Sequence, residues 1–212
     1  MKKTAMISKG HLARELDALH ALSDEEIDAS EIPERTDFSD GRLGKFFHLT
    51  SRDYDVRAIA NWCILRAKKQ SLEISNLWLN KIVYFIYEEA LQLNNIILTG
   101  AKAEAWDHGP VFREVYFGFK TDKTDQLLMS FDPLKKKRVA ARADFLKSDI
   151  AIFEGVWDRL AHLPAFHLRN ISHKSGQPWH TTWNYTGKSN PGMVIDIATI
   201  LEASHLRYRG NS

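Results

Sequence analysis

The segment that most constrains the fold spans residues 75–93, because as a helix it would be apolar on almost every side. One stripe at helical spacing consists of Leu79, Ile82, Val83, Ile86, Ala90 and Leu93. Much of the remaining circumference is covered by Leu77, Trp78, Tyr84 and Phe85. A helix with so little polar surface belongs in the middle of a domain, with other elements packed around it. Ser75 is a suitable N-cap, and Asn94 and Asn95 are expected to end the helix.

Four further segments have the apolar spacing of helices that would pack around the central one. They span residues 53–70, 148–163, 164–176 and 196–208. The third begins at Pro164, and Gly176 is expected to follow it as a C′ residue. Residues 96–106, "IILTGAKAEAW", have a β-rich start and a Thr-Gly pair, which predict a small β-hairpin. Residues 121–144 are polar and predict an irregular surface segment.

The stretch "EAWDHGPVFREVY" joins an acid-histidine pair to a Gly-Pro pair. Gly109 permits a positive φ, Pro110 suits the first position of a helix, and Asp107 is placed to cap that helix. The apolar stripe expected on this helix is Val111, Phe112, Val115, Tyr116 and Phe119. Trp106 is expected to pack beneath the turn. Because neighbouring side chains point in different directions, a carboxylate–imidazole bond between Asp107 and His108 is unfavourable, and a structural turn is the better interpretation.

The N-terminal part differs sharply in charge from the rest of the chain. Residues 24–40 hold eight acids and one base, a net charge of −7, in a chain whose formal net charge is +2. This strip repels itself and brings little apolar surface, so we expect an extended arm that orders only against a partner. A passive tail is the alternative. Residues 12–22 predict a short helix ahead of the strip, and the expected anchors along the arm are Ile27, Ile32, Phe38, Phe46 and Phe47.

These patterns predict a mainly α protein: a single globular helical domain with a small β-hairpin, preceded by an acidic N-terminal arm. The expected boundaries are residues 1–50 for the helix and arm, 53–207 for the domain and 208–212 for a tail. No apolar run approaches the roughly 20 residues of a membrane span, and the charged N-terminus does not resemble a signal peptide. Cys63 is the only cysteine, which excludes an intrachain disulfide and favours a cytoplasmic location.

The residues that could catalyse a reaction or bind a metal form no recognisable pattern. His167, His173 and His180 are six and seven residues apart, without the ligand spacing of a zinc site. The sequence contains no nucleophile elbow, no phosphate-binding glycine loop and no paired carboxylates in a recognisable setting. We therefore expect no catalytic residue, no metal and no cofactor. The basic run 135–138 is short, and a pI of about 8.6 does not favour nucleic acid as a partner.

Three groups of residues together resemble a known family. The central helix contains a Lys-Ile-x-Tyr run, the turn reads Ala-Trp-x-x-Gly-Pro-Val with a Tyr after it, and a Ser-His pair precedes a Pro-Trp pair. The matching residues are Lys81, Tyr84, Trp106, Gly109, Pro110, Val111, Tyr116, His173, Pro178 and Trp179. Over about residues 53–207 the chain resembles the Panacea domain of the SocA-like (GepA-like) antitoxins. It departs from the family pattern at Cys63-Ile64 and in the insertion "DPLKKKR".

The resemblance implies that the turn around Trp106 is a signature of the fold and that the domain acts by binding another protein. It implies an antitoxin of a type II toxin–antitoxin system, with a place in phage defence, that neutralises a co-encoded toxin without being an enzyme. Two alternatives stay open. The first alternative is a proteolytic adaptor that delivers the toxin to a AAA+ protease. The second is a DNA-binding autorepressor.

The expected partners are the cognate toxin, a second copy of the chain and a AAA+ protease. Near the turn, the residues expected to contact the toxin are Asp107, His108 and Arg113. The apolar anchors of the arm would add to this contact, and its acids would complement the basic active site of a toxin that acts on RNA or nucleotides.

Overall fold

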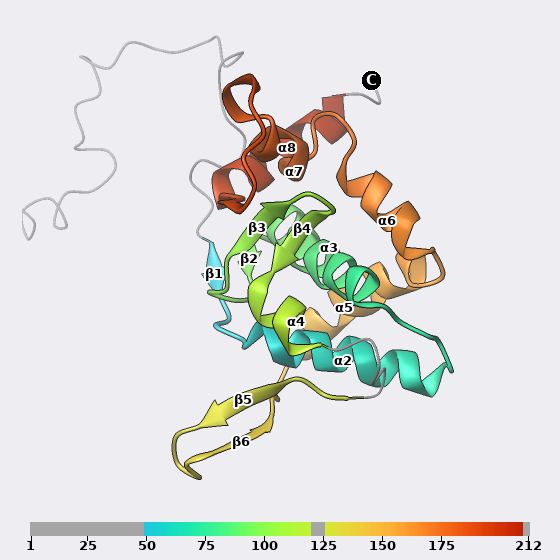
Figure 1. Ribbon diagram of the computed structural model, residues 1–212, viewed down its shortest axis with the longest axis vertical. Helices are drawn as coiled ribbons and strands as arrows, with labels where there is room; N and C mark the ends of the chain where they lie inside the picture. Colours follow the sequence, from blue (N-terminus) through green and yellow to red (C-terminus); the bar gives the residue numbers. More distant parts are fainter. Residues whose placement is uncertain (1–48, 120–125, 210–212) are drawn as a thin grey trace, which may run out of the picture. The chain divides into compact units, whose positions relative to one another are not determined.

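Helix α3, Asn76–Asn94, lies at the centre of the helices, as its apolar circumference predicts (Figure 1). The Ser75 hydroxyl caps its start by accepting a hydrogen bond from the Trp78 N–H at 3.2 Å. At the other end Asn95 adopts a left-handed conformation, with φ of 54°, which turns the chain out of the helix. Thirteen of the 19 residues are buried, so α3 is covered on all sides over most of its length.

The computed structural model describes residues 49–119 and 126–209, with the backbone alone over 204–209. These residues belong to one unit, Gly44–Ser212, which is described here by itself. The helix predicted at residues 12–22 and the acidic strip lie outside the described residues. So do the anchors Ile27, Ile32, Phe38, Phe46 and Phe47, whose role stays a prediction.

Helices on several sides of α3 complete a mainly α fold, as predicted. Packed against it are α2 (Val56–Lys69), α5 (Lys147–Leu160), α6 (Ala165–Ser172) and α8 (Ile197–Arg209). The shorter α4 (Arg113–Gly118), α7 (Pro178–Trp183) and a 3-10 turn (Tyr185–Gly187) complete the helical elements of the described part. Core side chains on α2 and α5 include Ile59, Cys63, Phe153 and Trp157, each at most 2% exposed. No described helix is both long and apolar enough to span a membrane.

In the described residues, three small sheets accompany the helices. Strand β1 (Thr50–Ser51) pairs in parallel with β2 (Ile96–Ile97), directly after α3. Strands β3 (Ala103–Trp106) and β4 (Gly109–Phe112) form an antiparallel hairpin, and β7 (Met193–Val194) joins the free side of β3. The predicted hairpin therefore exists, but it spans 103–112 instead of 96–106, and its turn is Asp107-His108 instead of Thr-Gly.

The prediction that Pro110 begins a helix is wrong. Pro110 lies in β4, opposite Ala105, and α4 begins only at Arg113. A proline is tolerated here because the strand is at the edge of its sheet and needs no hydrogen bond from this position. The Asp107 carboxylate consequently caps no helix, since the N-cap position of α4 is Phe112.

Part of the segment predicted to be irregular, 121–144, is an ordered hairpin of β5 (Met129–Asp132) and β6 (Lys137–Ala140). It extends away from the helices in Figure 1. Asn61, buried on α2, holds its base: the side-chain amide donates to the Leu128 and Ala141 carbonyls at 2.9 Å each. The amide oxygen of Asn61 accepts from the Leu128 N–H at 2.7 Å. The hairpin is polar and has little apolar surface to pack against the helices. The hydrogen bonds of Asn61 therefore attach it to α2.

The end of α6 also differs from the prediction. The helix stops at Ser172 with His173 as its C-cap, while Gly176 takes its positive φ, 80°, three residues later. The chain then starts α7, with Pro178 in the first turn. This helix was not predicted, because six residues are too few to display helical periodicity.

A buried carboxylate joins the start of the described chain to α5. Asp149, whose side chain is 0% exposed, accepts hydrogen bonds from Arg52 Nε at 2.7 Å and the Tyr54 hydroxyl at 2.8 Å. The Tyr54 oxygen accepts in turn from the Leu146 N–H at 3.2 Å. Burial alone would raise the pKa of Asp149, but the bonds from Arg52 and Tyr54 outweigh it and lower the pKa below its ordinary 3.8.

Replacing Asp149 by alanine should lower the free energy of unfolding by about 3 kcal/mol, because it leaves Arg52 and Tyr54 without their buried partner. The stabilisation by Asp149 exists above its unfolded pKa and is lost as the pH falls through the lower folded value. Urea unfolding at pH 7 and at acidic pH measures both effects. Asp158→Ala, at an exposed position of the same helix, is the control; an equal loss in both variants would contradict the prediction.

Candidate functional site

A polar stripe on α3 holds the segment that leads from β4 through α4. The Asn76 amide donates to the Tyr116 and Phe119 carbonyls at 2.8 Å each. Asn80 donates to the Asn76 side-chain oxygen at 2.7 Å, and its own oxygen accepts from the Phe112 N–H at 3.3 Å. These side-chain amides form hydrogen bonds with backbone groups that have no partner within a helix or sheet. Through these bonds the otherwise apolar helix α3 fixes the position of α4.

Lys81 extends the stripe beneath the turn. Its side chain is fully buried, and its Nζ donates to the Pro110 carbonyl at 2.8 Å. Burial, and secondarily the charge of Arg169, lowers the pKa of Lys81 from 10.5 to about 7. Gly109, with φ of 100°, passes directly over this lysine: a Cβ there would lie 2.8 Å from Lys81 Cε and 2.8 Å from Ser172 Oγ. The turn can approach Lys81 and α6 so closely only because residue 109 has no side chain.

The other side of the turn rests on α6 and α7. The Trp179 indole donates from Nε1 to the Trp106 carbonyl at 2.9 Å. His173 stacks on the Trp179 ring with 3.5 Å between centroids, and Trp183 stacks on Trp179 with 5.3 Å. Burial, followed by the charges of Arg169 and Lys81, lowers the pKa of His173 from 6.5 to about 4. His173 is therefore neutral at pH 7 and acts as a packing residue.

The structure thus brings most of the residues expected as a fold signature into one junction. Lys81, Gly109 and Pro110 meet beneath the turn, and Trp106, His173 and Trp179 meet beside it. The others contribute separately: Tyr84 and Val111 are buried core residues, Pro178 begins α7, and Tyr116 lies at the surface. Sequence reasoning missed Asn76, Asn80 and Asn61, although asparagines among apolar helical positions were a readable signal.

Outside this junction lies an aromatic platform, defined here as Trp106, Arg113, Tyr116 and Phe117. The Tyr116 ring lies 4.9 Å from Trp106 and 5.2 Å from Phe117, and the Arg113 guanidinium lies 5.9 Å above Trp106. The Glu104 carboxylate accepts from both Trp106 Nε1, at 2.9 Å, and Arg113 Nε, at 2.8 Å. Tyr116 and Phe117 are 41% and 67% exposed. Exposed aromatic rings beside an arginine have the composition of a protein-binding hot spot.

The platform corrects the expectation that Trp106 packs beneath the turn. Trp106 is only partly buried and faces Tyr116 and Phe117 on the outside. Asp107 and His108 form the turn itself, with side chains 81% and 71% exposed. The distance between His108 Nδ1 and Asp107 Oδ2 is 3.6 Å, too long for a hydrogen bond. Phe117, the most exposed aromatic ring of the platform, was not predicted.

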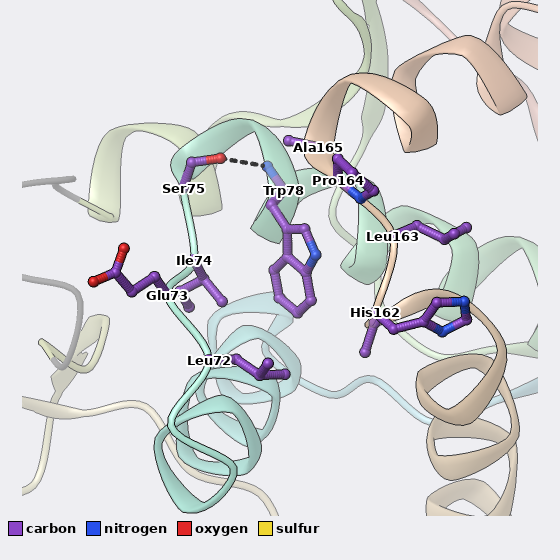
Figure 2. A pocket seen from close by; sticks show the side chains of 10 residues that line it. Leu72, Glu73, Ile74, Ser75, Trp78, His162, Leu163, Pro164 and Ala165 are labelled. Atoms are coloured by element: carbon purple, nitrogen blue, oxygen red, sulfur yellow. Dashed lines mark hydrogen bonds between the residues drawn. The ribbon is translucent and has the colours of Figure 1, made fainter.

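A separate hollow of about 530 Å³ lies between the α2–α3 loop and the α5–α6 loop (Figure 2). Trp78 and Ile74 line it on one side, with Leu163 and Pro164 on the other. The Ser75 hydroxyl at its rim is already engaged in capping α3. Among the described residues, no group of three or more His, Cys, Asp or Glu side chains is placed to hold a metal ion. The polar side chains that line the hollow are Glu73, Ser75 and His162.

Two comparisons with known proteins matched this chain. Residues 79–180 match the protein family described as Antitoxin SocA-like, Panacea domain. Antitoxin SocA of Caulobacter vibrioides is 29% identical over 161 residues, covering 73% of this chain and 84% of that protein. Over these residues the chain is similar to the SocA-like Panacea antitoxins. No solved structure matches it.

The matched part of the Panacea domain begins inside α3 and ends inside α7. It therefore contains the whole junction of Lys81, Gly109, His173 and Trp179, together with the platform. The signature residues of the junction contact one another within the domain, whereas Tyr116 and Phe117 of the platform are exposed.

Gly109→Ala should destabilise the domain by about 3–5 kcal/mol, because the new methyl group overlaps Lys81 and Ser172 and the backbone is strained. Gly187→Ala is a matched control: Gly187 also has a positive φ, 71°, but a Cβ there meets nothing within 4 Å. The control should cost only about 1–2 kcal/mol. Equal losses in thermal or urea unfolding would show that Gly109 is needed for its conformation alone.

Lys81→Met should change how stability depends on pH. Between about pH 7 and pH 9 the unfolded lysine keeps a proton that the folded one has lost, so the wild type gains about 2–3 kcal/mol of unfolding free energy as the pH rises. The variant should lack this gain, whereas Lys102→Met, at an exposed position, should keep it. Urea titrations across this range measure the difference; identical slopes in all three proteins would refute a buried, titrating Lys81.

Proposed function

We propose that this chain is an antitoxin of a type II toxin–antitoxin system, which neutralises a co-encoded protein toxin by binding it directly. The proposal is supported by the match of residues 79–180 to the SocA-like Panacea family and by the 29% identical relative, Antitoxin SocA. We assign the function to the domain over residues 53–207. Neutralisation by contact requires no catalytic residue of the chain.

The observation that carries the proposal is the aromatic platform. It lies within the matched region, and it combines the side chains that dominate protein-binding energetics: tryptophan, tyrosine and arginine. Glu104 holds two of these side chains in place, so little conformational entropy is lost when a partner binds. The predicted contact residues Asp107 and His108 are exposed in the turn next to Trp106, where they would extend the same surface.

The function is tested with the product of the neighbouring open reading frame. Expressed alone, that protein should arrest growth, and co-expression of this chain should restore growth and yield a complex on purification. The amount of toxin separates the mechanisms. Neutralisation by contact leaves the toxin intact in the complex, whereas a proteolytic adaptor would remove it. Growth arrest that persists despite equal expression of both proteins would refute the antitoxin assignment.

Within that complex, replacing Tyr116 and Phe117 together by alanine should weaken affinity by about tenfold or more, as the loss of hot-spot side chains does. Both rings are substantially exposed, so stability should change by less than about 1 kcal/mol. Phe166→Ala is the matched control, since Phe166 is 64% exposed on α6. Calorimetric titration measures affinity. Unchanged binding by the double variant would place the contact elsewhere on the domain.

A further inference from the structure

A cationic groove adjoins the platform and shares Arg113 and Phe117 with it. The start of α2, helix α4 and the base of the β5–β6 hairpin enclose a volume of about 350 Å³. The lining residues are Arg57, Arg113, Glu114, Phe117, Gly118, Met129 and Arg138. Its three arginines come from three elements that are distant in the sequence. The fold gathers three guanidinium groups around one opening, an arrangement suited to carboxylates.

The arginines keep most of their bonding capacity. Arg57 Nε donates to Asp55 at 2.9 Å, and Arg113 Nε donates to Glu104 at 2.8 Å. Within the described part of the chain, neither residue uses its terminal nitrogens in a hydrogen bond. Arg138 Nη2 makes one long contact, 3.5 Å, to the Met129 carbonyl. Each guanidinium is thus oriented by a neighbour while its outer edge remains able to bind a carboxylate in a bidentate manner.

The groove also has an apolar side that is already formed. Phe117, which is 67% exposed, and Met129 lie beside the arginines. A Cβ on Gly118 would lie only 3.0 Å from Leu128, so helix α4 and the hairpin base touch closely. The three hydrogen bonds of Asn61 fix the same base to α2. A preformed groove binds without the entropy cost of ordering its walls.

Positive charge continues from the groove along the hairpin. Lys135 and Lys136 lie in its turn and Lys137 begins β6; all three are exposed, and Lys135 pairs with Asp132 at 3.2 Å. The exposed apolar residues Phe131 (64%) and Leu134 (94%) lie on the same hairpin. The hairpin that extends away from the helices (Figure 1) therefore carries both basic and apolar exposed residues next to the groove.

We infer that this groove binds an acidic segment of a protein partner, with one aromatic or large apolar residue seated against Phe117 and Met129. The partner would be the toxin, so the inference rests on the proposed function. A protein segment fits better than nucleic acid because Asp55, Glu104 and Glu114 are interspersed among the arginines. These carboxylates repel a continuous row of phosphates, whereas a peptide can place its acids opposite the guanidinium groups and its apolar residue between them.

The binding chemistry is tested on the purified full-length chain with a labelled short peptide of Asp and Glu residues around one central Phe. Fluorescence anisotropy should show binding that weakens as salt is added. Replacing the central Phe by Ser should weaken binding about tenfold, and Arg138→Glu in the chain should do the same. Arg138→Lys keeps the charge but not the bidentate geometry, so it should weaken binding less than Arg138→Glu does. The charge reversal Lys188→Glu, at an exposed site outside the groove, should leave binding unchanged. A single-stranded RNA of equal charge should bind more weakly than the peptide.

Failure of the acidic peptide to bind, or loss of its binding equally in Arg138→Glu and Lys188→Glu, would overturn the inference. Tighter binding of the RNA would overturn it too. The second arm uses the toxin: Arg138→Glu should weaken the complex, while Lys188→Glu should not. Equal binding of toxin by both variants would refute the groove as a toxin contact and leave the antitoxin function standing. No toxin binding by the wild type would refute that function instead, while the peptide arm still decides the chemistry of the groove.

Discussion

The ammonium group of Lys81, buried under the Gly109–Pro110 backbone, is the contact on which the arrangement of the domain depends. It joins the most buried helix to the turn at its edge, and the turn can reach it only because Gly109 has no Cβ. Burying a lysine costs free energy, which its lowered pKa of about 7 reflects. The cost is tolerated because Lys81 donates a hydrogen bond to the Pro110 carbonyl. This bond also fixes β4, which is paired with another strand on only one side.

The platform and the groove both depend on this junction. Asn76 and Asn80 fix the chain between Phe112 and Phe119, so α4 has one position relative to α3. Because α4 is fixed, Arg113 and Phe117 are presented on the surface, and Gly118 lies against the hairpin base that Asn61 holds from α2. Polar side chains within apolar helices thus determine where the binding surface lies, although they are hidden from any partner.

The apolar spacing of neighbouring residues correctly predicted helices that are buried along most of their length or capped by a residue next to them in the sequence. The stripe on α2 and the apolar circumference of α3 gave correct helices, and Ser75 caps α3 as expected. Prediction failed where a distant partner decides the conformation. Pro110 was placed in a helix because nothing nearby in sequence shows its strand partner Ala105 or the Lys81 ammonium beneath it. The β5–β6 hairpin was missed because its support comes from Asn61, 67 residues away from Leu128 in the sequence.

By itself, the sequence determined that the fold is mainly α and that α3 is central. It also displayed the Trp-x-x-Gly-Pro-Val turn and the Ser-His pair that precedes a Pro-Trp pair. Helical periodicity and motif spacing can be read from the chain because they are properties of residues close together in the sequence. Only the tertiary structure decided what those residues do. It made Lys81 a buried support and His173 a partly buried one, and it left Tyr116 and Phe117 at the surface. It also gathered Arg57, Arg113 and Arg138 around one groove. Burial and convergence depend on which elements pack together, and chain order alone does not carry that information.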